Sequence, residues 1–220
     1  MNTEIKKMMN VSFKLFLSTL ITLTIVFVSI ALVNSFINII FSEKNILREL
    51  KSAFAYNLST LSVVILITYP ITLVTQDLDI FLSFTQKREN ISKTFIYLIL
   101  GLSIFMGFFL FNIIKLFSFL DFSERKLGEM LYLQLITILG IYLFANFIHF
   151  ISLIGKKYGS KYVFGILFLA ASFILINIIR IQEFILFGEN KLLITIFFVI
   201  SSAIFVFSNN KFVKKAENKN

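Results

Sequence analysis

The sequence has no cysteine and no tryptophan, and it has one proline and eight glycines in 220 residues. Without cysteine, neither a disulfide nor a thiolate metal or redox site is possible. Only 15% of the residues are charged, whereas a soluble domain of this length carries more charge and more turn residues. These shortages argue against a soluble globular domain.

Titratable groups for catalysis are equally scarce. His149 is the only histidine, so no multi-histidine metal site can form. No Gly-x-Ser-x-Gly setting for a nucleophile occurs. The stretch GLSIFMG, Gly101 to Gly107, lies within an apolar run and lacks the Lys-Ser/Thr of a phosphate loop. We therefore expect that this chain is not an enzyme by itself and binds no cofactor or metal.

What the sequence does contain is apolar residues, which make up 58% of the chain and include 29 phenylalanines. Continuous apolar runs of about 20 residues are the length that crosses a bilayer as an α-helix. We predict an all-α, polytopic membrane protein that is a single transmembrane domain over 1–220, without a soluble domain. The six expected spans are roughly 11–41, 54–75, 94–118, 130–154, 160–179 and 190–208, and the first is expected to stay uncleaved.

The distribution of positive charge predicts the orientation. The chain has a net charge of +9, but its basic residues are scattered between apolar runs, which favours membrane orientation over nucleic-acid binding. Thirteen of the 21 lysines and arginines fall in the N-terminus, the second and fourth gaps, and the C-terminal tail. We expect these segments, including both termini, to be cytoplasmic in a multi-pass protein of a bacterial cell membrane.

Two features within the spans each allow two interpretations. Tyr142, Asn146 and His149 share one helix face through their i, i+4, i+7 spacing. This polar seam is either a set of interhelical hydrogen bonds or the lining of a passage. Pro70 removes one backbone hydrogen bond from the second span and produces either a fixed kink or a hinge.

The stretch FLSFTQKRENISK, Phe81 to Lys93, is short, basic and amphipathic. We predict a helix over about 78–92 that lies in the cytoplasmic interface, with an apolar strip on one side. One alternative is that this helix merely rests among lipid headgroups. The other is that a partner protein binds it.

The layout resembles the membrane subunit, or permease, of ABC-2 type exporters, with a cytoplasmic coupling helix between the second and third spans. Leu82, Ser83, Phe84, Arg88 and Ile91 follow the family's coupling-helix pattern, whereas Thr85, Lys87 and Glu89 depart from it. The resemblance implies that a separate ATPase contacts this helix. The implied contact residues are Phe81, Ser83, Phe84, Lys87, Arg88, Glu89 and Ile91.

The same resemblance implies partners and further sites. A cytoplasmic ABC ATPase dimer would supply ATP and Mg, and a second permease subunit would complete the pore by homo- or heterodimerisation. The start NTEIKKMMNVSFKLF would be an interfacial helix before the first span, and Ile181, Phe184 and Ile185 would form an outer gate. Tyr142, Asn146 and His149 are the possible passage-lining residues.

The composition, rich in lysine, asparagine and isoleucine, is typical of a low-GC Gram-positive bacterium. Small permeases of this kind export amphipathic, antimicrobial or toxin-like peptides, such as phenol-soluble modulins, by alternating access. Two other classes stay open. One is the substrate-binding membrane subunit of an energy-coupling-factor vitamin importer, although the first span has Ala31 without an i+4 alanine. The other is a non-transporting immunity or assembly membrane protein.

Overall fold

The computed structural model describes residues 3–41, 46–83, 87–116, 127–159, 161–163, 165–166 and 191–215. Within these ranges every regular element is a helix and no strand occurs, as the sequence predicted. Two short elements, the π-helical turn η1 (Leu73–Asp77) and α3 (Leu78–Ser83), continue α2 without a break. The long helices are α1 (Thr3–Phe41), α2 (Ile46–Thr72), α4 (Arg88–Leu116), α5 (Leu127–Tyr158) and α7 (Lys191–Lys214).

Five helical segments of the described chain are long and apolar enough to cross a membrane, which indicates a multi-pass membrane protein. The predicted fifth span, 160–179, falls almost entirely outside the described residues, so the number six stays a prediction. The five candidate spans are Thr3–Ile30, Thr60–Ser83, Arg88–Asn112, Gly128–Tyr158 and Lys191–Lys214.

The surface of these helices is apolar. Leu192 and Phe207 are 74% and 70% exposed, and many other large apolar side chains along α1, α4 and α7 are also exposed. A water-soluble protein rarely leaves so much contiguous apolar surface uncovered. Lipid is the environment that suits it.

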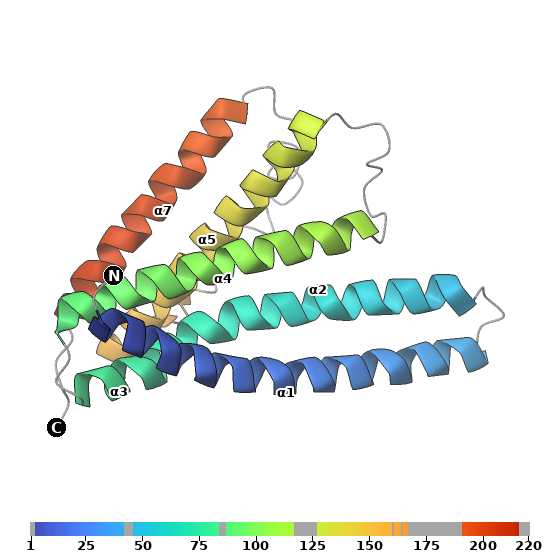
Figure 1. Cartoon of the computed structure of the whole chain (residues 1–220), viewed down its shortest axis with the longest axis horizontal. Coiled ribbons are helices and arrows are strands. Elements are labelled where there is room, and N and C mark those ends of the chain that lie inside the picture. Colours follow the sequence, from blue (N-terminus) through green and yellow to red (C-terminus); the bar gives the residue numbers. More distant parts are fainter. Residues whose placement is uncertain are drawn as a thin grey trace.

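The helices converge at one end of the molecule and spread apart toward the other (Figure 1). α1 packs against α2, α5 packs against α7, and α4 contacts both pairs. α1 and α4 begin at the convergent end, α5 and α7 finish there, and α3 lies beside them. The tightest core is at this end, where Leu73, Leu78, Ile91 and Phe95 are at most 2% exposed.

Basic residues gather at the convergent end, which we call the basic end. Asn90 at the start of α4 bonds to Glu4 of α1, and Arg88 bonds to the backbone of Lys214 in α7. The four segments that were predicted to share one side of the membrane therefore meet at one end. That this side is the cytoplasm stays a prediction. The described lysines of these four segments are Lys6, Lys7, Lys14, Lys87, Lys93, Lys156, Lys157, Lys161, Lys211, Lys214 and Lys215.

The start of the chain differs from its prediction. A separate interfacial helix was expected before the first span, but α1 is one helix of 39 residues from Thr3 to Phe41. Ile5, Met8 and Ser12 are buried and fall on one face by their spacing. Because that face packs into the core at the basic end, the helix continues through this region instead of turning along the membrane surface.

Candidate functional site

The stretch 78–92, predicted as one interfacial helix, is divided between two elements. α3 ends at Ser83, Lys87 is not helical, and α4 begins at Arg88. The amides of Asn90 and Ile91 both donate to the Lys87 carbonyl, at 2.8 and 3.1 Å, and so close the first turn of α4. The basic stretch thus includes the end of α3 and the start of α4, and these two helices contact each other.

The apolar residues of this stretch point inward. Phe81 is 3% exposed and Ile91 is fully buried, and the Phe81 ring centroid lies 6.1 Å from that of Phe95. In this structure neither side chain is available to fill a groove on a partner. Phe84, a third apolar residue of the predicted contact set, lies outside the described residues.

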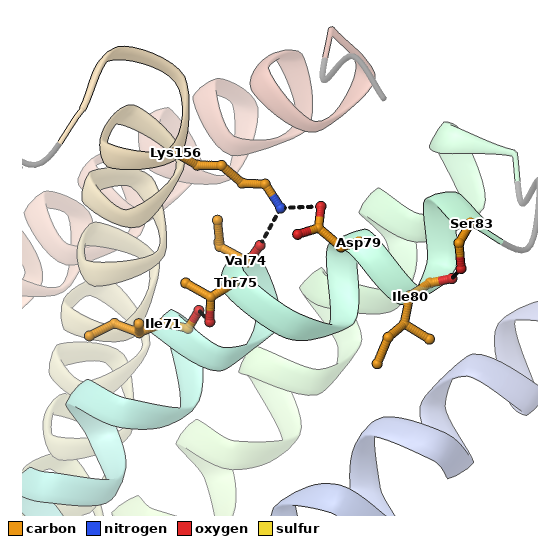
Figure 2. Close-up of polar contacts among 7 residues, drawn as sticks. All are labelled: Ile71, Val74, Thr75, Asp79, Ile80, Ser83 and Lys156. Carbon is orange, nitrogen blue, oxygen red and sulfur yellow. Dashed lines mark hydrogen bonds and ion pairs between the residues drawn. The ribbon is translucent and has the colours of Figure 1, made fainter. Parts of the chain in front are cut away.

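The polar residues of the predicted contact set are exposed. Ser83, Lys87, Arg88 and Glu89 are all exposed, and we call these four residues the basic turn. The Ser83 hydroxyl donates to the Ile80 carbonyl at 2.7 Å, at the end of α3 (Figure 2). The basic turn is thus the part of the predicted contact set that a partner can reach.

The basic turn and the residues that follow it in α4 are hydrogen-bonded to α1 and α7. Arg88 Nη1 donates to the Lys214 carbonyl at 3.2 Å, which connects the turn to the end of α7. Asn90 Nδ2 donates to Glu4 Oε2 of α1 at 2.6 Å. Ser92 Oγ donates to Asn210 Oδ1 of α7 at 2.8 Å. A displacement of the turn would therefore be felt directly by α1 and α7.

A lysine of α5 connects that helix to the same region. Lys156 Nζ donates to the Val74 carbonyl of η1 at 2.9 Å and to Asp79 Oδ1 of α3 at 2.5 Å (Figure 2). Lys156 is one of the thirteen basic residues that predicted the orientation, and Asp79 was not singled out. No local signal reveals the pair, because its members are 77 residues apart.

Replacing Lys156 with methionine is expected to loosen η1, because the Val74 carbonyl loses a charged donor. Since Lys156 is partly exposed, we expect a loss of about 1 kcal/mol in the free energy of unfolding. Amide hydrogen exchange over residues 74–79 should become faster in this variant. Lys211→Met, an exposed lysine of α7, is the control and should leave exchange in η1 unchanged. Equal exchange rates over residues 74–79 in both variants would mean that Lys156 does not support η1.

Pro70 lies one turn before η1, and together they interrupt the regular helical hydrogen bonds. Proline has no amide hydrogen to donate, and in η1 the Leu78 amide bonds to Leu73, five residues earlier. Isolated π-helical turns are uncommon and occur often at functional sites. The sequence predicted a local irregularity at Pro70 but not the π-helical turn that follows it.

The polar seam of α5 faces protein. Asn146 and His149 are each 1% exposed. His149 Nδ1 lies 3.3 Å from the Pro70 carbonyl, so this nitrogen carries the hydrogen, since a carbonyl only accepts. Asn209 Nδ2 of α7 donates to the Asn146 carbonyl and side-chain oxygens at 3.1 and 3.3 Å. Tyr142 is half-buried, and its carbonyl accepts from Asn146 Nδ2 at 2.9 Å.

A small cavity adjoins the seam where α4, α5 and α7 meet. It is partly open and is lined by Ser92, Phe95, Asn146, His149 and Asn209 among others. The edge of the His149 ring packs against Phe95 with 5.3 Å between centroids. The arrangement found here is the interhelical one, and a role in lining a passage stays a prediction.

Asp77 is a buried carboxylate that the sequence analysis did not single out. Its residue is 4% exposed, and its side chain accepts a hydrogen bond from the Ser12 hydroxyl of α1. The structure places it in η1, on a face that meets α1.

The predicted outer gate, Ile181, Phe184 and Ile185, lies outside the described residues. In the part of the chain that the structure describes, no three His, Cys, Asp or Glu residues cluster as a metal site. Comparison with known proteins finds no matching family, curated protein or solved structure. Function must therefore be argued from the basic end itself.

Proposed function

We propose that this chain is the membrane-spanning permease subunit of an ATP-driven exporter of the ABC-2 type. A separate cytoplasmic ATPase binds the basic turn. The observation that carries the proposal is the combination of exposure and attachment at this turn. Ser83, Lys87, Arg88 and Glu89 are open to a partner, while the residues around them are bonded to α1 and α7.

An external energy source is part of the proposal because the sequence contains no phosphate loop. If ATP drives the transport, a partner must therefore bind the nucleotide. Charged groups at the rim of an interface mainly set the rate and specificity of association. The basic turn, with Lys87 and Arg88 beside Glu89, suits an acidic rim on such an ATPase.

The proposed coupling runs through the contacts of the basic end. A movement of the turn reaches α1 through Asn90 and Glu4, and it reaches α7 through Ser92 and Asn210. Phe81 transmits the movement to Phe95 and the core. A second permease subunit, identical or paralogous, would complete the passage. The proposed cargo is an amphipathic peptide, as the resemblance to small peptide exporters implies.

The experiment that tests this proposal is co-purification from the native membrane in mild detergent, scored by ATP hydrolysis in the purified material. Lys87→Glu/Arg88→Glu reverses the charge of the basic turn and should lower the co-purifying ATPase activity at least about tenfold, because like charges brought against an acidic rim repel each other. Lys6→Glu/Lys7→Glu makes the same charge change on exposed residues of α1 and should keep the activity.

The other outcomes are equally informative. If activity persists in the basic-turn variant, the ATPase binds elsewhere on this chain. If the wild-type chain carries no ATPase activity, the permease proposal is wrong and a non-transporting membrane protein is favoured. Co-purification with a membrane scaffold protein as well as an ATPase would favour the vitamin-importer class.

A further inference from the structure

A groove between α1 and the second helix changes in chemistry along its length. It is a narrow groove that is partly open to the surroundings. The residues that define the groove are Ser12, Phe16 and Leu20 from α1, and Ile65, Tyr69 and Asp77 from the α2–η1 helix.

The polar end of the groove carries a carboxylate. Asp77 is 4% exposed, and Ser12 is its hydrogen-bond partner. Among the described residues no lysine or arginine forms an ion pair with Asp77. A buried carboxylate is costly unless a cation or several donors satisfy it. One hydroxyl leaves most of its acceptor capacity free.

The middle and far end of the groove become progressively apolar. The Phe16 and Tyr69 rings lie 4.4 Å apart between centroids, one helical turn beyond Ser12. Aromatic faces at this position also attract cations. One turn further, Leu20 and Ile65 line the groove with aliphatic groups. From Ser12 to Leu20 the α1 helix rises about 12 Å.

We propose that this groove binds an amphipathic cation, with an amine head at Asp77 and an apolar tail of about 12 Å along Leu20 and Ile65. The head meets the carboxylate, the Ser12 hydroxyl and the faces of two aromatic rings. The tail replaces lipid or water against aliphatic side chains. Gln76, which lines the groove next to Asp77, is exposed. This assignment holds whether or not an ATPase binds the basic turn.

The change along the groove, from a carboxylate at one end to aliphatic side chains at the other, excludes other classes of ligand. An anionic amphiphile would place its charge beside Asp77, where like charges repel. A neutral alcohol would fill the apolar end but would leave the carboxylate without a cation. A short polar cation would satisfy Asp77 but would leave the apolar end uncovered. Only a molecule that has both features matches the whole groove.

Binding can be measured by titration calorimetry on the full chain in nanodiscs, with empty nanodiscs as the reference for partitioning into lipid. The probes are octylammonium, 1-octanol and ethylammonium chloride. Wild type should bind octylammonium at least about tenfold more tightly than 1-octanol, the effect expected of one charge-assisted hydrogen bond. Equal affinity for the two probes would overturn the proposal.

Variants at each end of the groove separate head from tail. Asp77→Asn should abolish the preference for octylammonium over 1-octanol, and a preserved preference would contradict the proposal. Glu129→Gln removes an exposed carboxylate in the first turn of α5 and should leave the preference unchanged. Leu20→Trp fills the apolar end and should weaken octylammonium binding at least about tenfold. Binding of ethylammonium to this variant should be unchanged.

Folding of each variant is checked by circular dichroism and by its elution profile. If Asp77→Asn does not fold, Leu20→Trp decides the question by itself. Octylammonium binding as tight as in wild type would then show that the apolar end does not hold the tail. Ligand binding and ATPase co-purification are measured in separate experiments. Failure of this proposal and failure of the permease proposal are therefore distinguishable.

Discussion

Replacing Phe95 with alanine is expected to lower the free energy of unfolding by about 3–5 kcal/mol, the range for large-to-small changes at fully buried aromatic positions. Phe95 is 2% exposed and is the largest of the fully buried side chains. Its ring contacts Phe81 of α3 and His149 of α5. Its removal leaves a cavity where three helices meet.

The unfolding of this variant can be followed by loss of helical circular dichroism during titration with a denaturing detergent. Phe108→Ala is the matched control, since Phe108 lies on the same helix but is 49% exposed. It should change the free energy by less than about 0.5 kcal/mol. Similar losses in both variants would mean that burial at the basic end does not dominate stability.

Two glycines of α4 should respond in opposite directions to alanine. A Cβ at Gly107 would overlap the Ile138 Cγ1 atom of α5 and would lie 3.1 Å from the Ile138 Cα. Because a backbone atom cannot move aside cheaply, we expect Gly107→Ala to cost about 1–3 kcal/mol. Small residues permit this kind of close helix approach in membranes.

Gly101→Ala is the control on the same helix, because a Cβ there meets nothing within 4 Å. Alanine has the higher helix propensity, so this variant should gain up to about 1 kcal/mol. The same detergent titration measures both. A loss at Gly101, or no loss at Gly107, would contradict the close packing of α4 on α5.

The helices themselves were predictable because their signal is continuous. Apolar runs of bilayer length can be recognised from the sequence alone. The predicted spans 94–118 and 130–154 fall on α4 and α5, whose actual bounds are Arg88–Leu116 and Leu127–Tyr158. The structure extends the helices toward the basic end, because polar side chains there find partners on neighbouring helices.

The contacts of the basic end were not predictable for a different reason. The pairs Ser12 with Asp77, Lys156 with Asp79, and Asn209 with Asn146 are separated by 65, 77 and 63 residues. Hydropathy and charge counting treat each residue separately or with its neighbours in sequence. They cannot tell a lysine that faces solvent from one that caps a carbonyl of another helix.

The inward direction of Phe81 and Ile91 has a related cause. Periodicity predicted an apolar strip on the stretch 78–92 but could not say what would cover it. A partner protein and the chain's own core satisfy an apolar face equally well. The structure covers both side chains with Phe95 and the surrounding core.

The π-helical turn has a genetic consequence. An α-helix advances 100° per residue, and a turn of five residues instead of four behaves as an α-helix into which one residue has been inserted. Deleting a single residue within η1 would let the helix run on as regular α-helix. Everything after it would rotate by about 100° about the axis. Descendants or ancestors of this chain that differ by one residue there would present Asp77 and Asp79 to different neighbours, without any change of amino-acid type.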